Sequence, residues 1–325
     1  MTPSRFSLVS VSLVCFGLLC GIFTASAESL RVVSYNVENL FHPEVDSINT
    51  DTVYTPSGTR RWSFARYQRK VENIARVLTN IGEWYGVDII GLQEVENAAC
   101  LRKLCYTLRR GEYDFVHYDS PDLRGIDVAL IYKKNRLDTL RTKTLRVDLG
   151  KEFTRDILYV CGVVDQCDTL HFFVCHFPSQ LGGAAETEWK REQAKSVLQG
   201  AVDSILAVQP AAKIIVMGDF NSAPKEDIQG LSNRMMEFVR QGLGTHKYHG
   251  RWTCLDQFYT SPAVDSISSV GIYNAAWIQE TDEKNLGLRP KRCYNGFRYQ
   301  NGFSDHLPIF INCATSRLSS ASRRD

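Results

Sequence analysis

The sequence lacks any strong excess of charge of one sign. Its 325 residues hold 38 Lys and Arg against 36 Asp and Glu, and removal of residues 1–27 takes away one Arg, leaving 37 − 36 = +1. A nearly neutral protein has no overall field that attracts a polyanion, so affinity for phosphates or nucleic acid must come from a local patch. A glycine-rich phosphate loop and a G-x-S-x-G elbow are also missing, so neither chemistry is indicated.

Cysteine pairs with C-x-x-C spacing are missing too, which argues against a zinc site. Eight cysteines follow residue 27: Cys100, Cys105, Cys161, Cys167, Cys175, Cys254, Cys293 and Cys313. Disulfides can form in an exported protein. Cys161 and Cys167 flank a short turn and could face each other across a hairpin, and Cys100 and Cys105 are also close in sequence. Buried free thiols are the alternative, and the spacing does not decide between them.

Long apolar runs are confined to the N-terminus. Arg5 precedes an apolar stretch over residues 6–23, and Ala25-Ser26-Ala27 provides a small-residue cleavage site. This order is typical of a secretory signal peptide over residues 1–27 and predicts an exported protein, periplasmic or secreted. An uncleaved membrane anchor is the alternative, and bulky neighbours disfavour a lipid anchor at Cys20. After the signal, no apolar run approaches the roughly 18 residues of a membrane span.

The rest of the chain mixes strands with helices. Helical spacing of apolar residues predicts helices over 64–81, 97–110, 185–208 and 225–240. Strands are expected over 30–35, 88–92, 126–132, 156–164, 169–175, 213–217, 252–259, 270–276 and 307–313. Hairpin-like pairs among them favour one α/β domain with layered sheets over a regular βαβ array. We expect a monomeric domain over residues 28–314 and a polar, disordered tail over 315–325.

Polar side chains follow or interrupt the apolar strands at six places. They are Asn36, Glu94, His176, Asp219 with Asn221, Asp256, and Asp305 with His306. Each alone can be a helix cap or a turn residue, but catalytic groups also collect at such positions on a rigid scaffold. Carboxylate and amide oxygens suit Mg²⁺ or Ca²⁺, and histidines suit proton transfer. Asp256 lies inside an apolar strand, so it should pair with a cation or a histidine.

Five motifs occur in a fixed order: Ser34-Tyr35-Asn36, Leu92-Gln93-Glu94-Val95, His176-Phe177-Pro178-Ser179, Gly218-Asp219-Phe220-Asn221 and Ser304-Asp305-His306. Over roughly residues 30–313 the sequence resembles the endonuclease/exonuclease/phosphatase superfamily, which has the DNase I-like fold. The resemblance implies a four-layer α/β sandwich of two mostly antiparallel sheets flanked by helices. It also implies that the site lies at one end of this sandwich.

The resemblance further implies a role for each motif residue. Glu94 would be the main Mg²⁺ ligand, helped by Asn36 and Asp305, with Mn²⁺ or Ca²⁺ as alternative ions. Asp219 would orient or deprotonate the attacking water, and Asn221 would fix its geometry and contact the phosphate. His306 would contact the phosphate, oriented by Asp256, and His176 would stabilise the other phosphoryl oxygens or help the leaving group. Glu38 stands where abasic-site nucleases carry Asp, and His176 stands where they use Tyr. A histidine at that place is closer to the secreted nuclease and sphingomyelinase branches, which indicates a secreted, bacterial-type member.

Basic residues among aromatics indicate where substrate binds. Arg124 precedes a strand, and residues 288–299 precede the Asp305-His306 motif and include Lys291, Arg292 and Arg298. Such segments suit phosphates and stacked bases, although a solvated loop with inward-packed aromatics is the alternative. We expect a phosphate-ester substrate, most simply DNA or RNA. The alternatives are a lipid head group, an inositol phosphate or a nucleotide, and a catalytically dead binding module.

Overall fold

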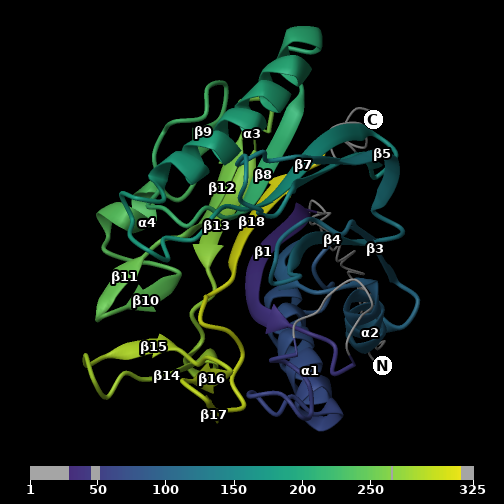
Figure 1. The fold of residues 1–325 in the computed structure, drawn as a ribbon. Helices are drawn as coiled ribbons and strands as arrows, with labels where there is room; N and C mark the ends of the chain where they lie inside the picture. Colours follow the sequence, from purple (N-terminus) through teal and green to yellow (C-terminus); the bar gives the residue numbers. More distant parts are fainter. Residues whose placement is uncertain (1–28, 45–51, 265, 316–325) are drawn as a thin grey trace, which may run out of the picture.

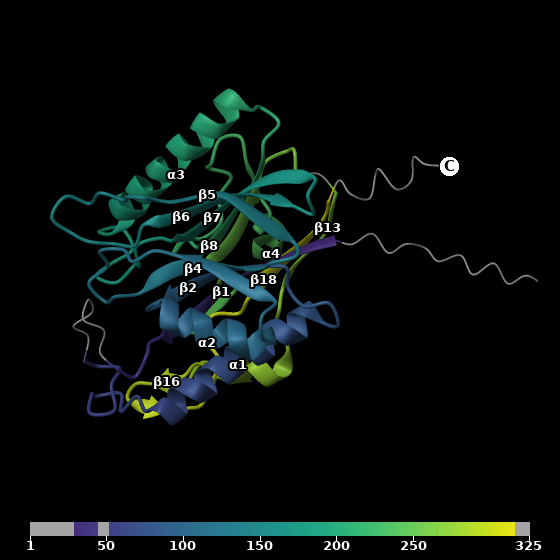
Figure 2. The same cartoon turned by 90° about the vertical axis from the view of Figure 1, so that its right-hand side faces the viewer.

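The computed structural model describes residues 29–44, 52–264 and 266–315. The expected signal peptide, residues 45–51 and residues 316–325 of the expected tail lie outside the described residues. Two six-stranded sheets pack face to face, and helices cover both outer faces (Figure 1 and Figure 2). This arrangement confirms the predicted α/β sandwich of four layers. None of the described helices is long and apolar enough to cross a membrane.

The first sheet joins the two ends of the described chain. Its strand order is β13-β18-β1-β2-β4-β3. The bounds are β13 Ile267–Ile272, β18 Ile309–Ala314, β1 Ser29–Leu40, β2 Ile89–Val95, β4 Asp127–Lys133 and β3 Tyr113–His117. β1 pairs antiparallel with β18 and parallel with β2, so it lies in the middle of the sheet.

The second sheet has the order β5-β6-β7-β8-β12-β9. The bounds are β5 Leu137–Leu145, β6 Ile157–Val164, β7 Asp168–His176, β8 Lys213–Asp219, β12 Asp256–Thr260 and β9 Ser232–Asn233. β7 and β8 are parallel, and helix α3 (Glu188–Val208) connects them. Since these two strands run in the same direction, their carboxyl ends meet at one edge of the sandwich.

Three apolar layers hold the sandwich together. One lies between the first sheet and helices α1 (Phe64–Gly82) and α2 (Ala98–Arg109), one lies between the sheets, and one lies under α3 (Figure 2). Residues of β8 alternate between the last two layers, with Ile215 and Met217 between the sheets and Val216 toward α3. A strand buried on both faces has a continuous apolar run, which is how residues 213–217 appear in the sequence.

The helices at 64–81 and 97–110 form as predicted. Ser63 caps α1 by accepting a hydrogen bond from Arg66 N, and Asn97 caps α2. The prediction of a helix over 225–240 is wrong: this segment is mostly loop, and only α4 (Met236–Arg240) is helical. Gly230 has a φ of 79°, and the Asn233 side chain donates to Lys225 O, so turn contacts replace the helix.

The hairpin of β6 and β7 forms as predicted, but its cysteines do not pair. Cys161 lies opposite His171 in the hairpin register, whereas Cys167 lies in the exposed turn. Of the two alternatives left open for Cys161 and Cys167, the structure shows the free thiols and not the pair. Cys100 and Cys105 are likewise free, buried on α2. Most of these cysteines are buried free thiols, which was the second interpretation of their spacing.

Several short elements extend from one end of the sandwich. They are the hairpins β10 (His246–Tyr248) with β11 (Arg251–Thr253), β14 (Gln279–Thr281) with β15 (Leu288–Pro290), and β16 (Tyr294–Asn295) with β17 (Arg298–Tyr299), and the turn η1 (Ala276–Ile278). Figure 1 shows the three hairpins gathered beyond the end of β1. They form a rim around the edge where the predicted polar residues lie.

Candidate functional site

The alternation of side chains along the strands directs the polar residues into the layer between the sheets. On four strands the predicted residue has the same parity as an apolar residue of that layer: Asn36 with Val32, His176 with Val174, Asp219 with Met217, and Asp256 with Phe258. Because side chains two residues apart face the same side, these polar groups occupy the open end of the inter-sheet core. All four are buried.

Glu94 reaches the same end through a bulge in β2. The register of β2 against both neighbours shifts between Gln93 and Val95, and Glu94 has a φ of 67°. Leu92 and Val95 therefore both pack under the helices although they are three residues apart. Bulges of this kind change the direction of side chains beside active sites. A glutamate whose backbone is in the left-handed region is strained, and such strain is typical of functional positions.

The Gly218-Asp219-Phe220-Asn221 motif is a strand end followed by a tight turn. A Cβ on Gly218, whose φ is 146°, would lie 1.9 Å from Cys175 O, so only glycine fits beside β7. Phe220 packs under α3 against Phe177. Asn221 lies past the strand with a φ of 48°, so strand alternation does not orient it. Instead its backbone N–H donates to Asp219 Oδ1 (2.8 Å) and its amide donates to Phe177 O (2.9 Å).

Asp219 Oδ2 is the point on which three predicted side chains converge. Asn36 Nδ2 donates to it at 3.0 Å, His176 Nε2 lies 3.7 Å away, and His306 Nε2 lies 3.8 Å away. Burial raises the pKa of Asp219, while His306 lowers it in part. The site thus places a carboxylate among groups that can exchange a proton with it or with a molecule between them.

His306 and Asp256 form a buried dyad. His306 Nδ1 lies 2.7 Å from Asp256 Oδ2, which confirms that Asp256 pairs with a histidine. Burial lowers the pKa of His306, but Asp256 and Asp219 outweigh burial and raise it well above the usual range. His306 is therefore an imidazolium, with Nε2 facing Asp219 and Nδ1 held by Asp256.

Glu94 and His176 form the other side of the site. His176 Nε2 lies 3.9 Å from Glu94 Oε1, and Asn39 N donates to Glu94 Oε2 at 2.9 Å. Arg124 Nη2 lies 3.6 Å from Glu94 Oε2 and 2.6 Å from Asn39 Oδ1. Burial lowers the pKa of His176 well below its usual range, and nearby cations lower it further. This histidine is consequently neutral, unlike His306.

Asp305 lies in a separate charged cluster beside the dyad. Arg292 Nη2 lies 2.5 Å from Asp305 Oδ2 and Arg292 Nε lies 4.0 Å from Glu38 Oε1. Burial raises the pKa of Asp305, but His306 and Arg292 outweigh burial and hold the pKa below its usual range. Ser304 Oγ donates to Asn36 O at 2.6 Å, which fixes the Asp305-His306 turn against β1.

Comparison with known proteins identifies this arrangement. The chain matches the Endonuclease/Exonuclease/phosphatase family over residues 31–315. It belongs to this family. Its members hydrolyse phosphate esters, so the chain is a phosphoesterase by family. No curated protein matches the chain at the level of its sequence.

Solved structures share the fold at low identity. TDP2 from Caenorhabditis elegans is 16% identical with a TM-score of 0.58, covering 89% of this chain and 76% of that chain. A mannosyl-6-phosphatase from Bacteroides thetaiotaomicron is 16% identical with a TM-score of 0.58, covering 88% of this chain and 100% of that one. D. rerio TDP2 complexed with single strand DNA product is 17% identical with a TM-score of 0.52, covering 89% and 100%. At these identities the likeness concerns the fold.

Two of the predicted substrate residues lie in the segment of the β14–β17 hairpins. Arg298 is exposed on β17, and Lys291 is half-buried with its backbone N–H bonded to Ile278 O. Arg124 and Arg292 do border the site through Glu94 and Asp305. Lys291 and Arg298 therefore belong to the rim of hairpins.

Three further residues, His246, Glu38 and Arg155, lie beside the phosphoesterase site. The His246 ring lies with its centroid 4.8 Å from that of His306, and burial, followed by the charge of His306, lowers the pKa of His246 to about 4. Glu38 is buried, accepts a bond from Cys293 N at 2.7 Å, and has its pKa raised by burial and by Asp305. Arg155 donates to Phe177 O at 3.0 Å. The position of Glu38 two residues after Asn36 was a signal, whereas His246 on β10 and Arg155 in the loop before β6 had none.

Proposed function

We propose that the chain is a secreted, divalent-metal-dependent phosphodiesterase in which water attacks phosphorus, with DNA or RNA as its substrate. The observation that carries this proposal is the convergence of Asn36, His176 and His306 on Asp219 Oδ2 at the end of the sandwich. A carboxylate at the centre of neutral and charged donors can take a proton from water while the others bind a phosphoryl group.

The donors at this end fit a single Mg²⁺ ion. Glu94 supplies a carboxylate whose side chain is 12% exposed, and Asn36 supplies an amide oxygen that also accepts from Glu38 N. Mg²⁺ is usually held by one or two carboxylates, water and substrate phosphate. Glu94 and Asn36 would provide the protein ligands of such a site. Asp305, which is bound to Arg292, would be a further ligand of the ion. When bound, the ion would lower the pKa of water and neutralise charge on the phosphoryl oxygens.

The protonation states define what the other residues do. Asp219 accepts the proton of the attacking water, and Asn221 fixes the turn that presents it. The His306 imidazolium, held by Asp256, donates to a phosphoryl oxygen where negative charge develops. Neutral His176 has its Nε2 3.9 Å from Glu94 Oε1 and 3.7 Å from Asp219 Oδ2, where it can donate to a phosphoryl oxygen of the substrate. The roles of the two histidines differ because His306 is charged and His176 is neutral.

The hairpin of β16 and β17 supports a nucleic-acid substrate. The Arg60 guanidinium stacks on Tyr294 at 4.8 Å and on Phe297 at 5.3 Å. Tyr294 is buried, but Phe297 is 77% exposed at the hairpin tip, and Arg298 is exposed beside it. Exposed aromatics next to cations bind stacked bases and phosphates. D. rerio TDP2, which shares this fold, has a structure complexed with single strand DNA product.

A phosphate ester on a small molecule is the second candidate, and two observations favour it. Arg124 and Arg292 are both ion-paired with acidic residues of the site, and the chain as a whole is nearly neutral. These two arginines are thus less available to bind successive phosphates of a long polyanion. A mannosyl-6-phosphatase shares the fold. Sugar, nucleotide and inositol phosphates and lipid head groups make up this class.

Substrate class is tested with a panel of single-stranded DNA, plasmid DNA, phosphomonoesters, phospholipids and a small aryl phosphodiester. If the substrate is a nucleic acid, Phe297→Ala should raise KM for single-stranded DNA about tenfold, the effect of one lost base stack. Hydrolysis of the aryl diester should be unchanged. Trp84→Ala, which removes an equally exposed aromatic, is the matched control. Faster hydrolysis of phosphomonoesters than of DNA would favour the second candidate.

Removing the metal should abolish activity, and Glu94 should determine the metal concentration required. We expect no turnover in chelator, recovery with Mg²⁺ or Mn²⁺, and a requirement for at least tenfold more Mg²⁺ in Glu94→Gln because one charged ligand is lost. The measurement is initial rate against metal concentration. Glu152→Gln, an exposed change elsewhere, serves as the control. Full activity in chelator would exclude metal dependence.

Export is proposed from the order of charge and apolar residues over 1–27. The intact mass of the exported protein decides it, because cleavage leaves Glu28 as the first residue. A mass that includes residues 1–27 would favour the membrane-anchor alternative.

A further inference from the structure

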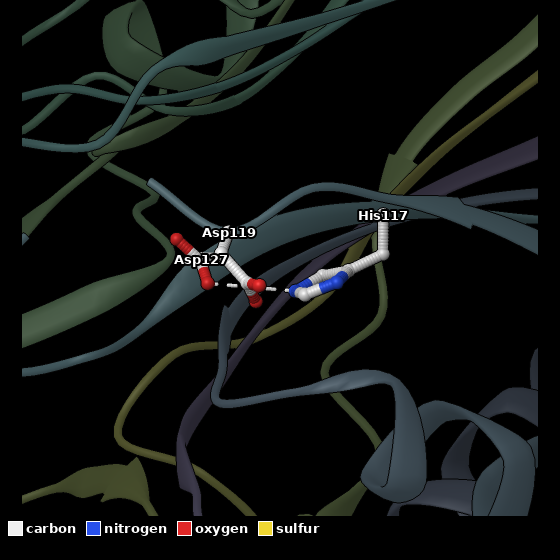
Figure 3. A group of neighbouring side chains, drawn as sticks. All are labelled: His117, Asp119 and Asp127. Carbon is white, nitrogen blue, oxygen red and sulfur yellow. Dashed lines mark ion pairs between the residues drawn. The ribbon is translucent and has the colours of Figure 1, made fainter. Parts of the chain in front are cut away.

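A compact group of ligating side chains lies on the β3–β4 hairpin. His117, Asp119 and Asp127 each offer one ligand atom, and these atoms all lie within 4.8 Å of one another. Figure 3 shows the three side chains pointing toward a common centre. His117 lies opposite Ala129 in the ladder, so His117 and Asp127, which is two residues before Ala129 on β4, share one face of the hairpin. Asp119 follows two residues after the end of β3.

The imidazole of His117 is buried, and its Nε2 has no hydrogen-bond partner. Its side chain is 4% exposed. Nε2 instead points at Asp127 Oδ2 from 3.5 Å, which is longer than the roughly 2.7–2.9 Å of a charge-assisted hydrogen bond. Two ligands bound tetrahedrally at about 2.1 Å lie about 3.4 Å apart. The 3.5 Å between His117 Nε2 and Asp127 Oδ2 therefore matches the distance between two ligands of one ion.

Asp127 is held in the orientation that a ligand requires. Ser120 donates from both its backbone N–H, at 3.0 Å, and its hydroxyl to Asp127 Oδ1. These bonds occupy one carboxylate oxygen and leave Oδ2 facing His117. Metal ligands are commonly oriented by such outer hydrogen bonds. Asp119 is exposed, so it provides the side through which an ion enters.

We propose that His117, Asp119 and Asp127 bind a divalent transition metal ion, of which Zn²⁺ is the representative. One imidazole and two carboxylates form a mixed nitrogen and oxygen set that suits Zn²⁺ better than Mg²⁺. The missing C-x-x-C pairs argued against zinc in the sequence, but this set uses no cysteine. The three residues are separate from those proposed for phosphoester hydrolysis, so this site does not depend on the proposed function.

Binding at this site would stabilise the loop that carries Arg124. The loop over 118–126 connects β3 to β4, and its two ends carry His117, Asp119 and Asp127. Arg124, near the middle of the loop, contacts Glu94 and Asn39. An ion that joins the two ends of the loop reduces its freedom and so favours the position of Arg124 beside Glu94.

The test is Zn²⁺ binding by equilibrium dialysis of the purified protein, with excess Mg²⁺ present to compete at the oxygen ligands of the phosphoesterase site. We expect one bound Zn²⁺ per chain. Asp119→Asn and His117→Gln should weaken Zn²⁺ binding at least tenfold, because each removes a ligand. Zn²⁺ should also raise the Tm of the unmodified protein and not that of Asp119→Asn. Since Asp119 is exposed, its replacement leaves the fold intact.

Two further variants separate this site from the phosphoesterase site. Asp114→Asn changes another exposed acid of β3 and should bind Zn²⁺ as the unmodified protein does, as should Glu94→Gln. Equal Zn²⁺ affinity in Asp119→Asn and the unmodified protein would overturn the proposal. So would loss of the bound Zn²⁺ in Glu94→Gln with retention in Asp119→Asn, since the ion would then belong to the phosphoesterase site.

Discussion

Replacing Asp219 with Asn should lower kcat for phosphoester hydrolysis about 10³-fold, within the range of a lost general base. The amide keeps the size of the carboxylate, and its one oxygen can still accept from Asn221 N, whereas its nitrogen cannot accept from Asn36 Nδ2. It cannot take a proton from water. The expected loss is therefore in kcat with little change in KM, because the interaction is needed only as the transition state forms. The measurement is steady-state kinetics at saturating metal.

The comparison with Glu94→Gln makes this prediction specific. Asp219→Asn should not be rescued by any Mg²⁺ concentration, whereas Glu94→Gln should recover rate as Mg²⁺ rises. Asp138→Asn, an exposed change of the same chemistry on β5, controls for the lost charge, and thermal unfolding checks the fold. A rate within threefold of the unmodified protein would remove Asp219 from its proposed role. Rescue by metal would make it a ligand instead.

How far the sequence predicts this site depends on strand alternation. Asp219 follows an apolar run in which odd-numbered residues face the inter-sheet layer, so its direction follows from those of Ile215 and Met217. The pairing of Asp256 is predictable as well, because a lone carboxylate in an apolar strand requires a partner. Residues that continue a regular strand can therefore be placed from the two-residue period of its side chains.

Residues at irregular backbone positions cannot be placed in this way. Simple alternation along β2 would turn Glu94 toward the helices with Leu92, and the bulge reverses that direction. Asn221 is oriented by a left-handed turn rather than by its strand. His246 meets His306 only through the isolated pairing of β10 with the turn before β18. Such contacts depend on long-range packing, which leaves no local pattern in the sequence.

The His306–Asp256 dyad offers the second large effect, and a double-mutant cycle tests it. His306→Ala should lower kcat about 10³-fold by removing the imidazolium donor. Asp256→Asn should lower it about 10²-fold, because the carboxylate orients Nδ1 and keeps the imidazole charged. Since Asp256 acts through His306, the double variant should be no slower than His306→Ala. Effects of residues that act as one unit do not add.

Stability separates this coupling from simple loss of fold. Asp256 is fully buried, so His306→Ala leaves a buried carboxylate without its partner, which costs about 3–5 kcal/mol of unfolding free energy. Adding Asp256→Asn removes that charge and should restore part of the stability without restoring the rate. Urea unfolding measures the first quantity and kcat the second, with the exposed His249→Ala as control. Additive losses of kcat in the double variant would show that Asp256 acts independently of His306.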